Sequence, residues 1–430
     1  MLERLFQLKA HGTDLKTEVI AGVTTFLTMA YIIVVNPSVL AAAGMDYGAV
    51  FAATCLAAAT GSLIMGLFAN YPIALAPGMG LNAFFTYTVV GQMGHSWQVA
   101  LGAVFMSGFL FFLLSIFRIR EWIINSIPQS LRLGIAAGIG LFLALIALHN
   151  TDIIVANPAT LVTLGDVTSA EALLTGLGFM LICALAARRV MGAVMVGIIA
   201  ITFLGFLLGM VEYRGFASAP PSLAPTFLQL DLQGAFDVGL ISIIFAFLFV
   251  DLFDTSGTLI GAAHRGNLLD RNGNLPRLGR ALMADSSATM AGAALGTSTT
   301  TSYIESTAGI AAGGRTGLTA VVVAALFLLA LFFAPLASMV PAFATAPALL
   351  YVATLMTSGL SHIDWEDITD AAPALVTALA MPLSFSIANG IALGFIAYVA
   401  VKLASGRIKQ LNAALLTIAA LFVLKFAFLG

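Results

Sequence analysis

The sequence predicts an all-α polytopic membrane protein. Of its 430 residues, 60% are hydrophobic and only 9% are charged, whereas a soluble domain carries roughly 25% charged residues. Between Glu18 and Arg118 the only formal charge is Asp46. Because one helical span needs about 20 apolar residues, this neutral stretch is long enough for several spans. The mean hydropathy of +1.04 likewise indicates that lipid covers most of the surface.

Apolar runs bounded by charges, proline and glycine predict fourteen spans, seven in each half of the chain. They are 19–40, 50–69, 72–90, 97–117, 132–149, 170–187 and 190–211, and then 236–262, 280–297, 298–313, 317–340, 344–360, 372–388 and 390–404. An odd number per half gives the halves opposite polarity, which is the inverted-repeat plan of secondary transporters. We therefore expect a first repeat at 1–211, a second at 236–404 and an apolar tail at 405–430. Within the tail, 411–428 either spans the membrane or lies at its interface.

The lysine and arginine residues predict the orientation of the chain, since cytoplasmic loops carry an excess of both. If the spans alternate, almost all loop lysines and arginines fall on the side of the N-terminus, with Arg214 as the exception. We therefore expect a multi-pass protein of the cell (inner) membrane with a cytoplasmic N-terminus. The chain has no basic patch of the kind that nucleic acid requires. Its cysteines and histidines have no metal-ligand spacing, so neither a metal nor a cofactor is expected.

The third span of each half is interrupted. Residues 71–85 contain two prolines and two glycines, which oppose a continuous helix. Residues 296–306 (GTSTTTSYIES) are rich in β-branched and hydroxyl side chains, which favour extended backbone. Each stretch is then expected to be followed by a short helical run. Paired interruptions at matching positions are typical of a transport site, because irregular backbone at membrane depth must be buried or line a cavity.

Four carboxylates lie inside the predicted spans, namely Asp251, Asp254, Asp285 and Glu305. A charge at the centre of a span costs at least roughly 2.5–3.5 kcal/mol, so such residues are functional candidates. A low dielectric favours their neutral form, and they could therefore exchange protons near neutral pH. Glu305, Asp254 and Asp285 are the candidate proton-coupling residues, although Asp285 could instead brace packed backbone. For Asp251 a structural role and a ligand role are equally open.

Asn82 follows the first interruption as Glu305 follows the second. Its amide offers two donors and an acceptor, which would suit the edge of a planar heterocycle or an interhelical hydrogen bond. Phe84 could stack on an aromatic ligand or pack in the core. The candidate ligand-binding residues are Asn82, Asp254, Glu305, Thr255, Phe84 and Thr300.

Three segments resemble signatures of the azaguanine-type purine permeases of the nucleobase–cation symporter (nucleobase–ascorbate transporter) superfamily. They are 75–85 (LAPGMGLNAFF), 252–259 (LFDTSGTL) and 303–306 (YIES), and segments 22–29 and 312–320 resemble that family too. The resemblance covers essentially the whole chain. It implies a core and a gate domain, short strands in the third and tenth spans, substrate between those strands, and a homodimer.

The resemblance also implies a function. Asp254, Glu305, Asn82 and Asp285 match the family's functional positions, and the LNAFF sequence at 81–85 is closer to the adenine branch than to the guanine/hypoxanthine branch. We therefore expect symport of a purine base, with adenine favoured, into the cytoplasm by an elevator-type movement. The coupling ion is expected to be H⁺, with Na⁺ left open. A guanine/hypoxanthine permease is the alternative.

Two further functional classes fit the sequence less well. An anion transporter of related architecture would attract its substrate to half-helix N-termini, but Glu305 would repel an anion there. An intramembrane enzyme with Mg²⁺ at Asp251 and Asp254 would need further acidic ligands and phosphate clamps, and the chain has no His-Glu-x-x-His motif. We therefore expect a transporter and not an enzyme.

Overall fold

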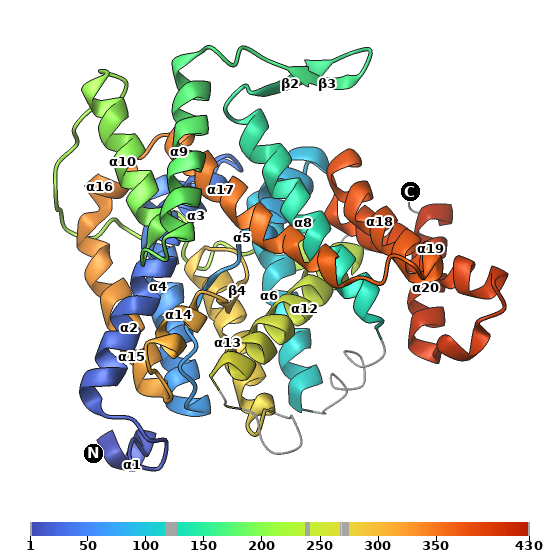
Figure 1. The fold of residues 1–430 in the computed structure, drawn as a ribbon, viewed down its shortest axis with the longest axis horizontal. Coiled ribbons are helices and arrows are strands. Elements are labelled where there is room, and N and C mark those ends of the chain that lie inside the picture. Colours follow the sequence, from blue (N-terminus) through green and yellow to red (C-terminus); the bar gives the residue numbers. More distant parts are fainter. Residues whose placement is uncertain (1, 117–126, 237–240, 267, 269–274, 429–430) are drawn as a thin grey trace.

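The computed structural model describes residues 2–116, 127–236, 241–266, 268 and 275–428, and these are mostly helical (Figure 1). The helices of the first half are α1 (Leu2–Phe6), α2 (Leu15–Met29), α3 (Ile32–Ala41), α4 (Tyr47–Ile64), α5 (Met79–Ala83), α6 (Trp97–Ile116), α8 (Gln129–His149), α9 (Ala170–Ala187), α10 (Ala193–Leu207) and α11 (Leu232–Ala235). Those of the second half are α12 (Ile241–Arg265), α13 (Leu278–Leu295), α14 (Ser306–Ala311), α15 (Gly317–Ala330), α16 (Ala334–Ser338), α17 (Ala342–Thr357), α18 (Ile368–Leu383), α19 (Ile387–Ala404) and α20 (Ala413–Phe428).

Among the described residues, nine helices are long and apolar enough to cross a membrane. Several agree closely with the predicted spans; for example, the spans predicted at 97–117 and 170–187 correspond to α6 and α9. Other predicted spans correspond to shorter helices. The span predicted at 190–211 is the 15-residue helix α10, and that at 372–388 is the 16-residue helix α18. The tail forms α20, which packs along α19 with the Phe395 and Phe422 ring centroids 6.0 Å apart.

The two interrupted spans contain the expected short strands. Strand β1 (Leu75–Pro77) pairs antiparallel with β4 (Thr300–Ser302), with Ala76 opposite Thr301. Helix α5 follows β1 and then continues as a π-helical stretch at Phe84–Gln92, while α14 follows β4. The strand pair therefore joins the two halves of the chain at the centre of the molecule. A second hairpin, β2 (Ile154–Asn157) with β3 (Leu161–Leu164), projects at the top of Figure 1.

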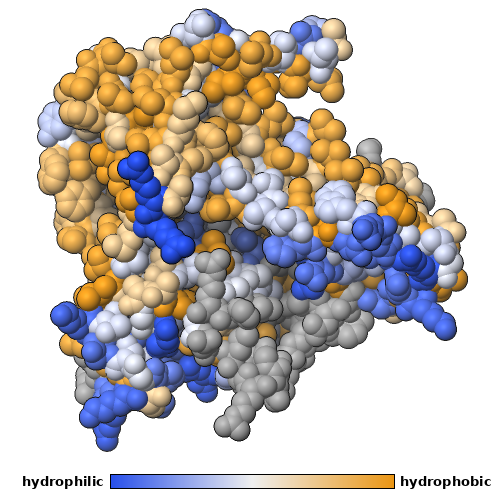
Figure 2. All heavy atoms as spheres, in the orientation of Figure 1, coloured by the Kyte–Doolittle hydropathy of each residue, from blue (hydrophilic) through white to orange (hydrophobic). Residues whose placement is uncertain are grey.

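The elements pack into two groups. In the first, which we call the strand group, helices α3, α4, α12 and α13 contact β1 or β4. Helices α6, α14 and α15 of this group pack against those four, and α2 packs against α14 and α15. In the second, which we call the α8 group, α8 packs against α17, α18 and α19, and α9 and α10 pack against α17. Each group draws helices from both halves of the chain. Figure 2 shows a broad hydrophobic surface over the region of α9 and α10, with hydrophilic residues gathered toward the lower edge of the view.

A buried carboxylate ties the start of α15 to α2. Glu18 is completely buried and accepts hydrogen bonds from the backbone N–H groups of Arg315, Thr316 and Thr319 and from the Thr319 hydroxyl, at 2.6–3.2 Å. The first N–H groups of a helix have no partner within the helix. The Thr316 hydroxyl accepts from the Leu318 N–H, and Glu18 accepts from the Thr319 N–H and from the two N–H groups just before the helix. It thereby fixes α15 against α2 inside the strand group.

Candidate functional site

A cavity of about 990 Å³ lies between the two groups of helices. The strand group contributes Tyr31, Asp254 and Glu305 to its wall, and the α8 group contributes Arg132 and Tyr351. Exposed residues at its margin include Gln129 and Arg189, which belong to the side of the chain that carries the basic loops. The cavity lining thus includes both exposed residues near the basic loops and the two carboxylates.

Glu305 and Asp254 approach the cavity from different elements. Glu305 stands between β4 and the first turn of α14, and its Oε1 accepts a 2.6 Å hydrogen bond from the Tyr31 hydroxyl. Asp254 lies on α12 with its side chain exposed to the cavity, whereas Glu305 is half-buried. The structure therefore brings together the two carboxylates that the sequence singled out most strongly.

Asp285 and Asp251 lie elsewhere, behind the strands. Both are completely buried and neither lines the cavity. The Asp285 carboxylate accepts hydrogen bonds from the N–H and hydroxyl of Ser302, at 2.9 and 2.8 Å, and from the Thr255 hydroxyl at 2.8 Å. Asp251 accepts one from the Thr289 hydroxyl at 3.2 Å. These contacts make Asp285 a brace for β4 and place Thr255 in that brace.

Asn82, Phe84 and Thr300 are completely buried and do not line the cavity. The Asn82 amide has no hydrogen-bond partner among the described residues. Phe84 makes an edge-to-face contact with Phe247 at 4.9 Å between ring centroids. The structure thus separates these three candidates from Asp254 and Glu305.

The expected position of a ligand between the two strands is wrong for this structure. β1 and β4 are directly hydrogen-bonded, and the Gly78 N–H donates to the Thr299 carbonyl at 2.9 Å just beyond the ladder. Paired strands lie only about 4.8 Å apart, which leaves no room for a heterocycle. A ligand in the cavity would lie beside the strand pair.

Three residues of the cavity wall were missed in the sequence. Tyr31 and Tyr351 lie within predicted spans, and Arg132 was used only to orient the chain. The one available signal was chemical, since a tyrosine buried in an apolar run usually finds a partner for its hydroxyl. Nothing in the local sequence indicated that the partner of Tyr31 would be a glutamate 274 residues away.

The comparisons with known proteins agree with this architecture. Residues 16–393 match the Permease family. The chain belongs to this family. This permease is 54% identical over 429 residues to the adenine permease AdeP of Escherichia coli, with coverage of 100% of this chain and 96% of AdeP. It is 47% identical over 440 residues to the guanine/hypoxanthine permease PbuG of Bacillus subtilis, with full coverage of both chains.

The resemblance of the sequence motifs to those of purine permeases is therefore confirmed, and the family is one of permeases rather than enzymes.

Solved structures share the fold of this permease. The transmembrane domain of a cyanobacterial bicarbonate transporter, BicA, superposes with a TM-score of 0.67 at 17% identity, covering 87% of this chain and 97% of that domain. The murine anion transporter Slc26a9 in its inward-facing state gives 0.66 at 12% identity, covering 92% and 69%. At these identities the likeness concerns the fold alone.

Proposed function

We propose that this permease is a proton-coupled symporter that brings a purine base, preferentially adenine, into the cytoplasm. Adenine permeases of Escherichia coli match essentially its whole length at 54% and 52% identity. The single observation that carries the mechanism is the placement of Asp254 and Glu305 on one cavity whose walls belong to both groups of helices. The guanine/hypoxanthine alternative is favoured by the 47% identity to PbuG, so base preference is part of the test.

The two carboxylates supply a reason for coupling. Two bare carboxylates around a dry ligand repel each other, and removing both from water is costly. One proton relieves that repulsion, and the carboxylate that remains ionised accepts a hydrogen bond from a ring N–H or an exocyclic amino group. The two titrations are coupled, so the proton belongs to the pair rather than to either residue. Purine and proton would therefore enter the closed site together.

The proposed movement is an elevator in which the strand group is the core domain and the α8 group is the gate domain. The full plan is fourteen spans in two inverted sevens, 1–211 and 236–404, with the tail 405–430 after them. We place the protein in the inner membrane as a homodimer with a cytoplasmic N-terminus, so that the cavity opens inward. This orientation is supported by the basic residues at the cavity margin and by the positive-inside rule.

The remaining candidate residues take supporting roles in this scheme. Asp285 and Thr255 hold β4 through the hydrogen bonds described above, and Asp285 remains a candidate proton relay. Asn82, Phe84 and Thr300 are buried away from the cavity. The unpartnered amide of Asn82 is costly to bury, and it would be satisfied if movement of the core brought it to the edge of a purine.

Uptake of labelled adenine into cells or vesicles that contain this permease tests the proposal. A protonophore should abolish accumulation, and unlabelled adenine should compete better than guanine, hypoxanthine, uracil or xanthine. Better competition by guanine or hypoxanthine would instead assign the other purine branch. Absence of any nucleobase uptake would reject the proposal and reopen the anion-transporter hypothesis.

Asp254→Asn tests the role of the carboxylate pair. We expect it to abolish accumulation against a gradient, because the pair can then no longer exchange its proton. Asp152→Asn, on an exposed turn outside the cavity, should accumulate adenine as the wild type does. Accumulation by the Asp254→Asn protein at the wild-type level would remove Asp254 from the scheme.

A further inference from the structure

Arg132 is a cation in the cavity that the proposed mechanism does not use. It projects from the first turn of α8 and lines the cavity together with Asp254 and Glu305. A cation near a helix N-terminus is disfavoured by the helix dipole, so helix stability does not explain its position. Its buried Nε atom has no hydrogen-bond partner in the part of the chain that the structure describes. A partly buried cation of this kind interacts strongly with charges that appear in the same cavity.

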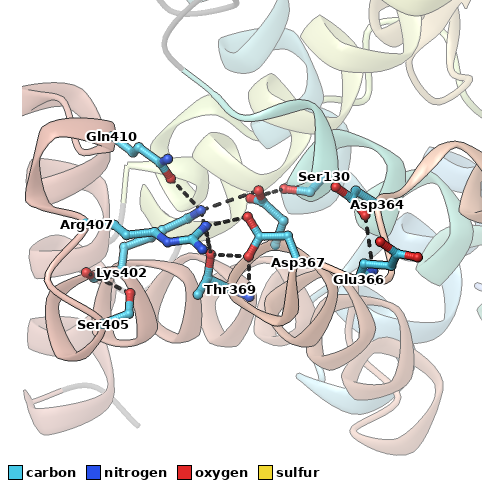
Figure 3. Close-up of polar contacts among 10 residues, drawn as sticks. Ser130, Asp364, Glu366, Asp367, Thr369, Lys402, Ser405, Arg407 and Gln410 are labelled. Carbon is cyan, nitrogen blue, oxygen red and sulfur yellow. Dashed lines mark hydrogen bonds and ion pairs between the residues drawn. The ribbon is translucent and has the colours of Figure 1, made fainter.

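The neighbouring charges of the α8 group are already paired with one another (Figure 3). The Lys402 amine is completely buried, lies 3.3 Å from an Asp370 oxygen, and donates to the Thr369 hydroxyl at 2.8 Å and to the Gln410 side chain at 2.6 Å. Arg407 forms an ion pair with Asp367. Arg132 belongs to neither of these two ion pairs.

The same network holds the turn from which Arg132 projects. The Ser130 hydroxyl donates to the other Asp370 oxygen at 3.0 Å, so the start of α8 is tied to α18 and, through Lys402, to α19. Gly134, one turn further along α8, packs directly on the Ala374 backbone of α18. Arg132 is therefore fixed on the α8 group, while the two carboxylates of the cavity belong to the strand group.

Among the side chains that the structure describes, no other titratable group near α8 forms an ion pair with Arg132. Of those on elements packed against α8, Asp370, Tyr398 and Lys402 belong to the network, and His362 is exposed. Asp251 is buried behind the strands, and Tyr351 and Asp254 line the cavity. Tyr31, Arg189 and Glu305 complete the titratable lining. Arg189 is an exposed arginine at the margin, where solvent screens its charge.

We propose that Arg132 is the fixed countercharge that drives release of the coupled proton into the cytoplasm. This inference rests on the proposed proton coupling of Asp254 and Glu305. When the cavity is open to the cytoplasm, the guanidinium stabilises the ionised form of the carboxylate pair, so the proton leaves. When the strand group moves outward, the carboxylates leave Arg132 behind and bind a proton more tightly. One stationary cation thus gives the same pair different proton affinities on the two sides of the membrane.

The size of the effect follows from Coulomb's law. Two unit charges roughly 10 Å apart in a partly hydrated protein site change a proton affinity by on the order of tenfold. Removing the Arg132 charge should therefore make the inward-open carrier hold its proton about tenfold more tightly. Raising the internal pH by about one unit should compensate.

The test separates net uptake, which needs proton release, from exchange, which does not. In right-side-out vesicles at fixed external pH, Arg132→Gln should lower proton-driven adenine uptake about tenfold relative to the wild type. Exchange of labelled external adenine for unlabelled internal adenine should stay within about twofold of the wild type. Raising the internal pH by one unit should bring the uptake ratio of variant to wild type back toward one. Arg132→Lys should retain most uptake, because it keeps the charge.

Arg188→Gln is the matched control. Arg188 is an exposed arginine beside Arg189 that does not line the cavity, and its loss should change neither reaction. Equal losses of uptake and exchange in Arg132→Gln would show a structural or binding role and overturn the inference, as would wild-type uptake or a defect that internal pH does not relieve. If the proposed function itself is wrong, the wild-type protein will show no protonophore-sensitive uptake. That result would overturn both the proposed function and the inference about Arg132.

Discussion

Because Tyr31 donates a hydrogen bond to Glu305, removing its single hydroxyl oxygen should strongly reduce transport. Tyr31→Phe keeps the ring but deletes the donor 2.6 Å from the carboxylate. A hydrogen bond to a charged group is worth about 1.5–3 kcal/mol, so adenine transport should fall at least roughly tenfold in a labelled-uptake assay. Tyr351→Phe is the control, since Tyr351 lines the same cavity from the α8 group. Wild-type transport by the Tyr31→Phe protein would mean that the Tyr31 hydroxyl is dispensable.

The contribution of Asp367, which lies outside the spans, to the stability of the fold should depend on pH. The Thr369 hydroxyl, together with Arg407, lowers its pKa from 3.8 to about 2. A carboxyl group whose pKa is lower in the folded state stabilises that state above the unfolded pKa, and this contribution is lost as the pH falls toward the folded pKa. The difference in unfolding temperature between wild type and Asp367→Asn should therefore be constant from pH 7 to about 4 and shrink toward pH 2. A difference that already shrinks near pH 6 would contradict this, and Asp152→Asn serves as the control.

At the scale of one element, α15 depends on an acceptor supplied by another helix. Glu18→Gln keeps the shape of the side chain but replaces one acceptor oxygen with an NH₂ donor among N–H groups that need acceptors. Leaving buried donors unsatisfied costs about 1–3 kcal/mol each, so the unfolding temperature of the detergent-solubilised protein should fall by several degrees. Glu171→Gln, in the exposed first turn of α9, should change little. An unchanged melting temperature for Glu18→Gln would mean that α15 does not need this cap.

The elements themselves were predictable where the sequence carries a local signal. Proline and glycine before Asn82, and the threonine run before Glu305, predicted both interruptions because each disfavours helix through its own backbone and side-chain chemistry. The threonine run also predicted extended backbone, whereas the strand before Asn82 was implied only by the resemblance to the purine permeases. The site was only half predictable. The free-energy cost of a charge inside a span identified Asp254 and Glu305. The burial of Asn82 and the hydrogen bond from Tyr31, in contrast, depend on packing between distant segments. No local pattern encodes such contacts.

At the scale of the whole molecule, the two groups of helices must move relative to each other if the proposed mechanism holds. Helix α5 directly follows β1 and packs on α3 of the strand group. A Cβ atom placed on Gly80 of α5 would lie 3.8 Å from the Cβ of Ile139 on α8, which is the usual separation in a disulfide. In a background with Cys55 and Cys183 replaced by alanine, Gly80→Cys with Ile139→Cys should therefore cross-link on oxidation. Uptake should be lost in the oxidised protein and restored by a reductant.

Each single cysteine variant controls for the substitutions themselves and should transport equally with and without oxidant. Full uptake by the cross-linked double variant would rule out a movement between α5 and α8. The movement would then have to be sought within one of the two groups.

The pairing of β1 with β4 has a consequence for how the protein is made. Pro77 pairs with Thr300. Apart from Leu75, whose N–H and C=O bond the Ser62 hydroxyl, β1 therefore lacks its ladder partners until more than 220 further residues have been synthesised. At about 5–20 residues per second, a ribosome needs roughly 10–45 s to supply those partners. During this interval the nascent first half carries unpaired amide groups that lipid cannot satisfy. Biogenesis of this permease therefore requires that its third segment wait in a water-accessible or chaperoned environment, and membrane insertion can be completed only after translation has passed residue 302.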